Sequence, residues 1–363
     1  MRKKNIKVAV GMSGGVDSSV AAAILKKQGY QVIGIFMHFW AEPDNKENQK
    51  SFNKCCSVEA QNDARRVADI LDIPLYTINL DINFKKDIVD DFVSQYEQGL
   101  TPNPCVRCNQ FIKFGYFLEK AKALGCDYIA TGHYVRLKKD RQGYHLKEAK
   151  DPAKDQTYFL HRLNQKVLAH CLFPIGDYKK DKVRKMAAKF KLPVFNKRDS
   201  QEICFVPAKD HYSFLQKYAT FMPGDIITPD NQIIGQHQGL PLYTIGQRKG
   251  IELNNGPWYV ADMDFANNKL IVTNDPQHPS LYNDIMYLSE VVWLNKEIKL
   301  PAKLEIRIRY MHKNQQGTLS KINNNLYQVK FKTKQRAVTP GQYAVFYKNR
   351  EVLGGGKIIK NTN

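Results

Sequence analysis

Short apolar runs and helical patterns alternate along the first two hundred residues. The apolar runs, which are typical of buried strands, lie at residues 6–10 (IKVAV), 30–37 (YQVIGIFM), 74–80 (PLYTINL) and 127–135 (DYIATGHYV). Apolar positions at helical spacing lie between them, at residues 18–29, 58–73 and 111–125. This alternation predicts βαβ units and a parallel sheet, and therefore an α/β fold.

The pattern changes after Cys204. Residues 224–275 hold short strand-like pieces between turn signals such as PDN and NNGP, which indicates a small central domain. From about residue 288 the apolar segments are short and close together, which favours a small antiparallel β-barrel. We therefore expect a catalytic α/β domain over 1–205, a central mixed domain over 206–280 and a C-terminal β-barrel over 281–363.

The chain is strongly basic. Its 363 residues include 55 Lys and Arg against 35 Asp and Glu, a net charge of +20. Residues 281–363 carry 15 basic and 5 acidic side chains, so half of the surplus lies in the expected barrel. Such a surplus favours a polyanion such as nucleic acid, or an acidic membrane surface, although a lysine-rich genome produces the same composition.

Cysteine usage and hydropathy favour the cytoplasm. No apolar run approaches the ~18 residues of a membrane span, and the apolar stretch near the N-terminus is too short for a signal peptide. The seven cysteines are an odd number at dispersed positions, which is typical of reduced thiols. We expect Cys126 and Cys171 to be small buried residues, and we leave the roles of Cys55 and Cys56 open.

A glycine- and serine-rich turn joins the first expected strand to the first expected helix, in KVAVGMSGGVDSSVAAAIL. Gly14 and Gly15 permit a tight turn whose amide groups converge on an anion, and Ser18 adds a hydroxyl at the helix N-terminus. Asp17 suits such a site if it helps to hold Mg²⁺ that the phosphates share. The turn matches neither the Walker A pattern nor GxGxxG.

The string SGGVDS resembles the PP-loop of ATP pyrophosphatases, which release pyrophosphate and leave AMP on an acceptor oxygen. The resemblance implies ATP and Mg²⁺ as cofactors and the activation of a poor leaving group. Several families share this loop, so it does not identify the second nucleophile.

Further motifs occur in one order across the chain. They are GMSGGVDSSVAA, CCSVEAQNDARRVADIL, TPNPCVRCNQFIKFG, ATGHY, AKDQTYFL, DSQEICF, YTIGQRKG and RIRY. Together they resemble the tRNA-specific 2-thiouridylases, which replace O2 of the wobble uridine with sulfur. The resemblance implies a tRNA-uridine 2-sulfurtransferase that adenylates O2 of U34 and then transfers sulfur, giving 2-thiouridine, AMP and pyrophosphate.

The resemblance also implies the site residues. Cys204 corresponds to the persulfide carrier and Cys108 to its attacking or resolving partner, 96 residues away along the chain. The implied ATP-binding residues are Gly11, Met12, Ser13, Gly14, Gly15, Val16, Asp17, Ser18, Met37 and Gly132. The implied tRNA-contacting residues are Asn103, Pro104, Cys105, His133, Lys154, Asp155, Gln156, Arg309, Tyr310 and Gln342. The target base is expected to leave its stack to reach them.

One position departs from the family pattern. Many members read Asn-Pro-Asp-x-x-Cys, whereas this chain has Cys105 in place of the Asp, which casts doubt on an acid/base role there. Three thiolates from Cys105, Cys108 and Cys204 could hold a [4Fe–4S] cluster with one open iron that delivers sulfur. A persulfide on Cys204 is the competing mechanism and the one we favour, and a structural zinc clip is a third.

The resemblance implies partners as well. We expect tRNAs for Lys, Glu and Gln with U34, and a cysteine desulfurase or a sulfur-relay protein as the donor. Two other function classes stay open: a PP-loop synthetase that acts on a small metabolite, and a non-catalytic RNA-binding protein. Residues 176–193 (GDYKKDKVRKMAAKFKLP) form a basic helical pattern beside the site, a pattern typical of a solvated face.

Overall fold

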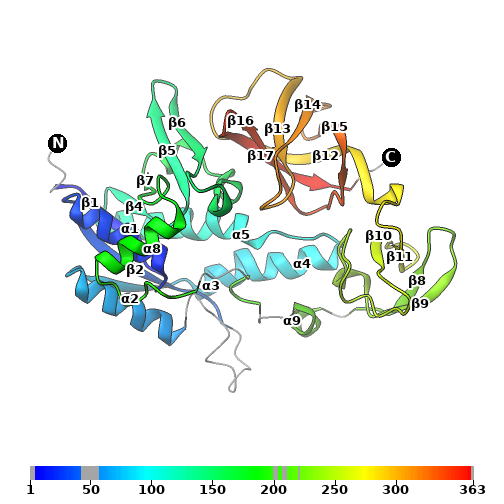
Figure 1. Ribbon diagram of the computed structural model, residues 1–363, viewed down its shortest axis with the longest axis horizontal. Helices are drawn as coiled ribbons and strands as arrows, with labels where there is room; N and C mark the ends of the chain where they lie inside the picture. The colour runs from blue at the N-terminus through cyan, green and yellow to red at the C-terminus, as the bar shows by residue number, and fades with distance from the viewer. Residues whose placement is uncertain (1–4, 42–56, 199–202, 207–210, 220, 361–363) are drawn as a thin grey trace.

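The computed structural model describes residues 5–41, 57–198, 203–206, 211–219 and 221–360. Cys55 and Cys56, whose roles the sequence left open, lie outside these ranges. Figure 1 shows a parallel sheet with its helices on one side of the molecule, a barrel on the other, and a small central sheet beyond two long helical segments.

The N-terminal domain is built on a parallel sheet in the order β3-β2-β1-β4-β7. Its strands are β1 (Lys7–Gly11), β2 (Gln31–His38), β3 (Leu75–Asn79), β4 (Tyr128–Ala130) and β7 (Cys171–Leu172). Four of them coincide with the apolar runs, so the expected parallel sheet and α/β fold are confirmed.

Helices cover both faces of this sheet. Because successive strand residues point to opposite faces, Val8 and Val10 pack in one core and Ala9 packs in another. The first core includes residues of three helices, α1 (Val16–Lys27), α2 (Val58–Ile70) and α8 (Lys180–Lys189). The second core includes residues of α6 (Phe117–Ala123).

Two helical rods extend from the sheet toward the central domain, and each contains a π-helical stretch (Figure 1). The first consists of α3 (Asp81–Phe84), the π-helical segment Lys85–Asp90 and α4 (Asp91–Glu97). The second consists of α5 (Pro104–Arg107), the π-helical segment Cys108–Tyr116 and α6. Cys105 and Cys108 therefore lie on the second rod.

An aromatic core fixes the segment that carries Cys204 against the first rod. The ring of Phe205 lies 5.7 Å from Phe84 and 5.2 Å from Phe92, between ring centroids, and 5.7 Å from Phe214. Phe214 belongs to α9 (His211–Tyr218). This apolar packing, rather than a regular element, places Cys204.

The central domain is a mixed four-stranded sheet in the order β10-β11-β8-β9, in which β11 and β8 are parallel. Its strands are β8 (Gly224–Ile227), β9 (Ile233–His237), β10 (Tyr259–Asp264) and β11 (Lys269–Thr273). The expected small mixed domain is confirmed.

The C-terminal domain is an antiparallel barrel in the order β12-β15-β14-β13-β16-β17, which the pairing of β17 with β12 closes. Its strands are β12 (Tyr282–Trp293), β13 (Ala302–Arg307), β14 (Gln315–Lys321), β15 (Tyr327–Arg336), β16 (Tyr343–Lys348) and β17 (Glu351–Ile359). The barrel is confirmed, although the first of these strands begins earlier than the sequence pattern indicated.

One expected strand is wrong in its second half. Residues 127–135 do not form one strand, because β4 ends at Ala130 and Val135 begins a hairpin of β5 (Val135–Asp140) and β6 (Gly143–Glu148). The chain turns between them at Gly132, against the start of α1. The hairpin then joins the barrel sheet through the pairing of Lys147 with Glu351.

The remaining elements are short. They are α7 (Gln165–Leu168) and the 3-10 turns Pro152–Lys154, Thr157–Leu160, Leu240–Leu242 and Pro279–Leu281. Across the described ranges, none of the helices has the length and apolar character that crossing a membrane requires.

Candidate active site

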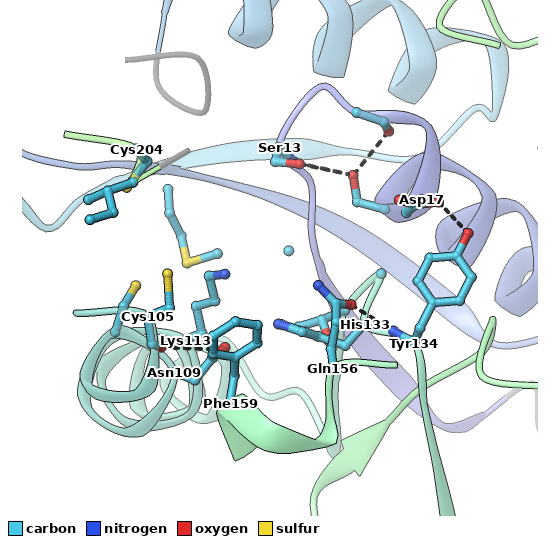
Figure 2. Close-up of a pocket in the computed structure, with 18 of the residues that line it drawn as sticks. Ser13, Asp17, Cys105, Asn109, Lys113, His133, Tyr134, Gln156, Phe159 and Cys204 are labelled. Atoms are coloured by element: carbon cyan, nitrogen blue, oxygen red, sulfur yellow. Dashed lines mark hydrogen bonds between the residues drawn. The ribbon is translucent and has the colours of Figure 1, made fainter. Parts of the chain in front are cut away.

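A single cavity of about 670 Å³ collects most of the implied site residues. The turn after β1 lines one end, and the two rods with the Cys204 segment line the other. Figure 2 shows Ser13 and Asp17 of the turn at one end, and Cys105 and Cys204 at the other. We refer to these as the nucleotide end, defined by residues 11–18, and the sulfur end, defined by Cys105, Cys108 and Cys204.

Hydrogen bonds between residues that are close in the sequence hold the nucleotide end in shape. The backbone N–H of Ser13 donates to Ser18 Oγ over 3.3 Å, and the hydroxyls of Ser18 and Ser19 donate to the Gly15 carbonyl over 3.3 and 2.8 Å. The first turn of α1 therefore holds the loop in shape at a helix N-terminus, where backbone amides favour an anion.

Two glycines allow the close approaches on which this shape depends. Gly14 has φ +67°, and a Cβ there would lie 2.2 Å from the Ala60 carbonyl of α2. A Cβ on Gly132 would lie 2.6 Å from the Ser18 nitrogen and 2.7 Å from the carbonyl carbon of Asp17. The loop is thus pressed between the start of α2 and the turn after β4.

Asp17 is neutralised by a lysine from a distant helix. Lys180 Nζ donates to both carboxylate oxygens, over 2.9 and 2.8 Å, and the Tyr134 hydroxyl donates to Oδ1 over 2.8 Å. Lys180 begins α8 and is buried, so the expectation of a solvated face is wrong for this residue. Asp17 faces the cavity, but Lys180 already balances its charge.

The other implied nucleotide residues divide into two groups. Gly11, Ser13 to Ser18, Met37 and Gly132 line the cavity. Met12 does not, because its side chain is buried in the core beneath the loop.

Figure 2 shows Cys105 and Cys204 on facing walls of the sulfur end. Cys108 is buried, whereas Cys105 and Cys204 are half-buried, and all three line the cavity. The structure thus brings together the implied persulfide carrier and its implied partner, which are 96 residues apart.

The three cysteines do not fit a metal cluster as they stand. Among the residues that the structure describes, no group of three His, Cys, Asp or Glu side chains is arranged to hold a metal ion. The geometry therefore gives no support to a [4Fe–4S] cluster on Cys105, Cys108 and Cys204, or to a zinc clip there.

Six of the implied tRNA-contacting residues line the cavity. They are Pro104, Cys105, His133, Lys154, Gln156 and Tyr310. Gln156 Oε1 accepts from the Tyr134 N–H over 2.9 Å, which ties this wall to the residue that also holds Asp17. Tyr310 packs on Phe159 with ring centroids 4.4 Å apart.

The other four lie behind the wall and contact each other or the barrel. Asn103 Oδ1 caps α5 at Val106 N, and Asn103 Nδ2 donates to Gln342 Oε1 over 3.3 Å. Arg309 donates to the Ala337 carbonyl over 2.7 Å, and Asp155 is buried against Arg307 at 3.0 Å. A direct tRNA contact by any of these four stays a prediction.

Some cavity residues were missed in the sequence, most notably Asn109, Lys113, Phe159 and Tyr134. The spacing of Lys113 from Cys108 places both residues on one face only if the helix is wound as a π-helix. In a π-helix residue i bonds to i+5, so Lys113 lies above Cys108 on one face. An α-helical period would separate the same two residues by about 140°.

Three family models match the chain in succession. They are described as a tRNA methyl transferase HUP domain over residues 6–208, a tRNA methyl transferase PRC-barrel domain over 212–274, and an aminomethyltransferase β-barrel domain over 283–358. The first alone covers more than half of the chain.

Curated relatives match at almost full length. A tRNA-specific 2-thiouridylase MnmA from Clostridium perfringens is 43% identical over 362 residues, which are 99% of each chain. A protein of the same name from Symbiobacterium thermophilum is 45% identical over 98% of this chain and 93% of its own. Another, from Caldanaerobacter subterraneus subsp. tengcongensis, is 46% identical over 98% of both chains. The chain belongs to the family of tRNA-specific 2-thiouridylases.

Proposed function

We propose that this chain is a sulfurtransferase that converts the wobble uridine U34 of tRNA to 2-thiouridine at the expense of ATP. One observation carries the proposal: a nucleotide loop and cysteines from two distant segments line the same cavity. Such a cavity can hold the reacting base within reach of both reagents, which is what two successive displacements at one base require.

The first step is adenylation at the nucleotide end. The amide groups of residues 11–18 at the start of α1 would hold the phosphates of ATP, and Asp17 would help to hold the Mg²⁺ that accompanies them and neutralises their charge. Uracil O2 attacks the α-phosphorus, the O2–P bond forms, and the bond to pyrophosphate breaks. O2, a poor leaving group, has then become part of a good one.

The second step is sulfur transfer at the sulfur end. A persulfide on Cys204 attacks C2, and AMP leaves with the electron pair of the C2–O2 bond. The Cys108 thiolate then attacks Cys204 Sγ, which forms a disulfide and leaves the outer sulfur on C2 as 2-thiouridine. The disulfide must be reduced by a thiol reductant before the next cycle.

The partners are proposed from the basic charge and from the family resemblance. The basic surplus, half of which lies in residues 281–363, favours tRNA. We propose that residues 206–280 and 281–363 form two domains that contact the tRNA beyond the cavity, and the charge supports this for the second of them. We further propose tRNAs for Lys, Glu and Gln as substrates, a cysteine desulfurase or relay protein as sulfur donor, and the cytoplasm as location.

Methyl transfer, which the descriptions of two family models name, is the other reaction to weigh. A methyltransferase needs a methyl donor but has no use for a pyrophosphate-releasing loop facing a cluster of thiols. The residues of this cavity therefore favour sulfur transfer.

The test begins with protein prepared anaerobically and stripped of iron by a chelator. It receives Mg-ATP, an unmodified tRNA transcript with U34 and a persulfide-loaded cysteine desulfurase, and mass spectrometry of the digested tRNA detects 2-thiouridine. Product from iron-free protein is the expected result and supports the persulfide route. Product only after iron and sulfide are restored would make Cys105, Cys108 and Cys204 cluster ligands, and no product in either case would contradict sulfur transfer.

A further inference from the structure

The adenylation step needs a base at uracil N3. When O2 bonds to phosphorus, C2 and N3 become doubly bonded and the proton on N3 has to leave. Cys105 stands where many family members have an aspartate, so that position supplies no carboxylate. Among the described residues that line the cavity, Asp17 is the one carboxylate, and Lys180 and Tyr134 occupy its oxygens.

His133 lies in the cavity wall between the two ends. Its Nδ1 lies 2.8 Å from Thr131 Oγ1, and its ring packs against Phe114 and Phe173 with centroids 5.7 and 6.5 Å away. Burial and the charge of Lys113 hold the pKa of His133 well below its usual range, so the ring is neutral. In the tautomer whose Nδ1–H donates to Thr131 Oγ1, Nε2 carries the lone pair, and this is the tautomer that the step below requires.

Within the described part of the chain, Nε2 of this histidine has no hydrogen-bond partner, and the residue lines the cavity. Figure 2 shows the ring beside Gln156, on the wall that faces Lys113 and Phe159. Phe159 and Tyr310, whose ring centroids lie 4.4 Å apart, both line the cavity and form an apolar aromatic surface for an extruded base. A pyrimidine stacked there lies between the nucleotide loop and the cysteines.

Lys113 supplies the positive charge for the same base. Its ammonium projects into the space between the sulfur end and His133 (Figure 2). A cation there stabilises negative charge on O2 as the N3–H bond breaks, in a site that is partly shielded from water. The same charge disfavours a protonated His133 and so keeps the imidazole available as an acceptor.

We propose that His133 Nε2 accepts the N3 proton of the target uracil while O2 attacks the α-phosphorus of ATP, and that Lys113 stabilises the charge on O2. The inference rests on the proposed function and assigns the base of its first step. The N–H electron pair becomes the second bond between C2 and N3, pyrophosphate leaves with the pair of the broken P–O bond, and the proton stays on Nε2. It returns to N3 when sulfur has replaced O2.

A weakly basic imidazole suffices for this transfer. Bond formation between O2 and phosphorus withdraws electrons from N3, so the N3–H group becomes strongly acidic as the reaction proceeds. The acceptor therefore needs to be unprotonated and correctly placed rather than strongly basic.

The experiment varies the acidity of N3–H and the base together. His133→Gln and wild type receive tRNA with uridine or with 5-fluorouridine at position 34, whose fluorine makes N3–H more acidic, and single-turnover release of pyrophosphate is measured. With uridine the variant is expected to be slower by about 10²-fold or more. With 5-fluorouridine the defect is expected to shrink at least about tenfold, because a more acidic proton depends less on its acceptor.

Phe114→Leu is the matched control, since it disturbs the packing of His133 without removing the acceptor. Its release of pyrophosphate should be slowed equally with uridine and with 5-fluorouridine. Pyrophosphate release by Lys113→Gln should also be slowed less with 5-fluorouridine than with uridine. This variant replaces His133→Gln as the test if His133→Gln does not fold. If wild type releases pyrophosphate but His133→Gln is slowed equally with uridine and with 5-fluorouridine, the inference is overturned and the proposed function is not. Wild type that releases no pyrophosphate with either tRNA would overturn the proposed function itself.

Discussion

The two ends of the cavity are built in different ways. The nucleotide end consists of eight consecutive residues whose backbone is fixed by short polar contacts with the first turn of α1. The sulfur end joins Cys108 to Cys204 across 96 residues, and apolar packing of Phe205 on Phe84 and Phe92 places the second cysteine. We therefore expect the two half-reactions to depend on separate structural features and to be impaired by separate substitutions.

The largest expected effect comes from Cys204→Ser and Cys108→Ser. Serine nearly preserves the shape but cannot carry or resolve a persulfide, so formation of 2-thiouridine should fall by at least about 10³-fold. Pyrophosphate release that depends on tRNA should stay within about threefold of wild type, because neither residue belongs to the nucleotide end. The two products are measured separately in single-turnover reactions, by mass spectrometry and by a pyrophosphate assay.

Cys171→Ser is the control for these variants. Its thiol donates to the Val167 carbonyl over 3.2 Å, and burial raises its pKa, so it is an uncharged thiol distant from the chemistry. Both products should form at the wild-type rate. Loss of pyrophosphate release in Cys204→Ser would show instead that the two ends act as one unit.

The converse variant is Gly14→Ala, at the nucleotide end. The new Cβ would meet the Ala60 carbonyl at 2.2 Å, and the left-handed backbone adds strain. The KM for ATP in pyrophosphate release should rise about 100-fold, equivalent to about 2.7 kcal/mol of lost binding. Loading of the persulfide onto Cys204 from the desulfurase, measured without ATP, should be unchanged.

Gly29→Ala separates the clash from the strain. Gly29 has φ +86° and also requires the left-handed region, but a Cβ there meets nothing within 4 Å. It should lower stability by about 1 kcal/mol and leave the KM for ATP unaltered. Equal effects of the two substitutions would mean that the loop is less tightly fixed than its contacts indicate.

The same difference explains what the sequence could predict. Residues 11–18 form a local motif, so strand, turn and helix start could all be placed before any tertiary contact was known. The parallel sheet and the barrel were also accessible, because their strands are short apolar runs with regular spacing. The break of residues 127–135 into β4 and a hairpin was not, since it depends on the contact of Gly132 with α1.

Contacts across the fold stayed hidden for physical reasons. Lys180 sits in a basic helix of ordinary appearance, and only the packing of α8 beside α1 turns it toward Asp17. The position of Lys113 could not be predicted because it depends on π-helical winding, which residue propensities in CNQFIKFGY do not indicate. Asp155 stands in a motif that the family resemblance assigns to tRNA, yet its ion pair with Arg307 becomes visible only when the barrel docks on the N-terminal domain.

A smaller effect is expected from Lys180→Met, which tests the charge balance of the nucleotide end. Removal of the ammonium leaves Asp17 beside the phosphates with its charge uncompensated, so the KM for ATP should rise about tenfold, or about 1.4 kcal/mol. The effect should diminish as Mg²⁺ concentration increases, because Mg²⁺ can then balance the carboxylate. Lys180→Arg should retain most of the affinity. A fall in kcat at constant KM would place Lys180 in the chemistry rather than in nucleotide binding.

The smallest effect is expected outside both ends, where His145 of β6 joins the barrel. His145 Nδ1 lies 2.6 Å from Glu351 and Nε2 lies 2.9 Å from Asp140. Burial opposes its charged form, but the hydrogen bonds to these two carboxylates prevail and raise the pKa of His145. Its contribution to stability is therefore complete below its unfolded pKa of about 6.5 and is lost as pH rises through the folded value.

His145→Gln should lower the Tm by about 2 °C at acidic pH and less at alkaline pH, with unchanged yields of pyrophosphate and 2-thiouridine. A Tm difference that grew with pH would contradict the pairing, and a change in either product would tie this junction to the cavity.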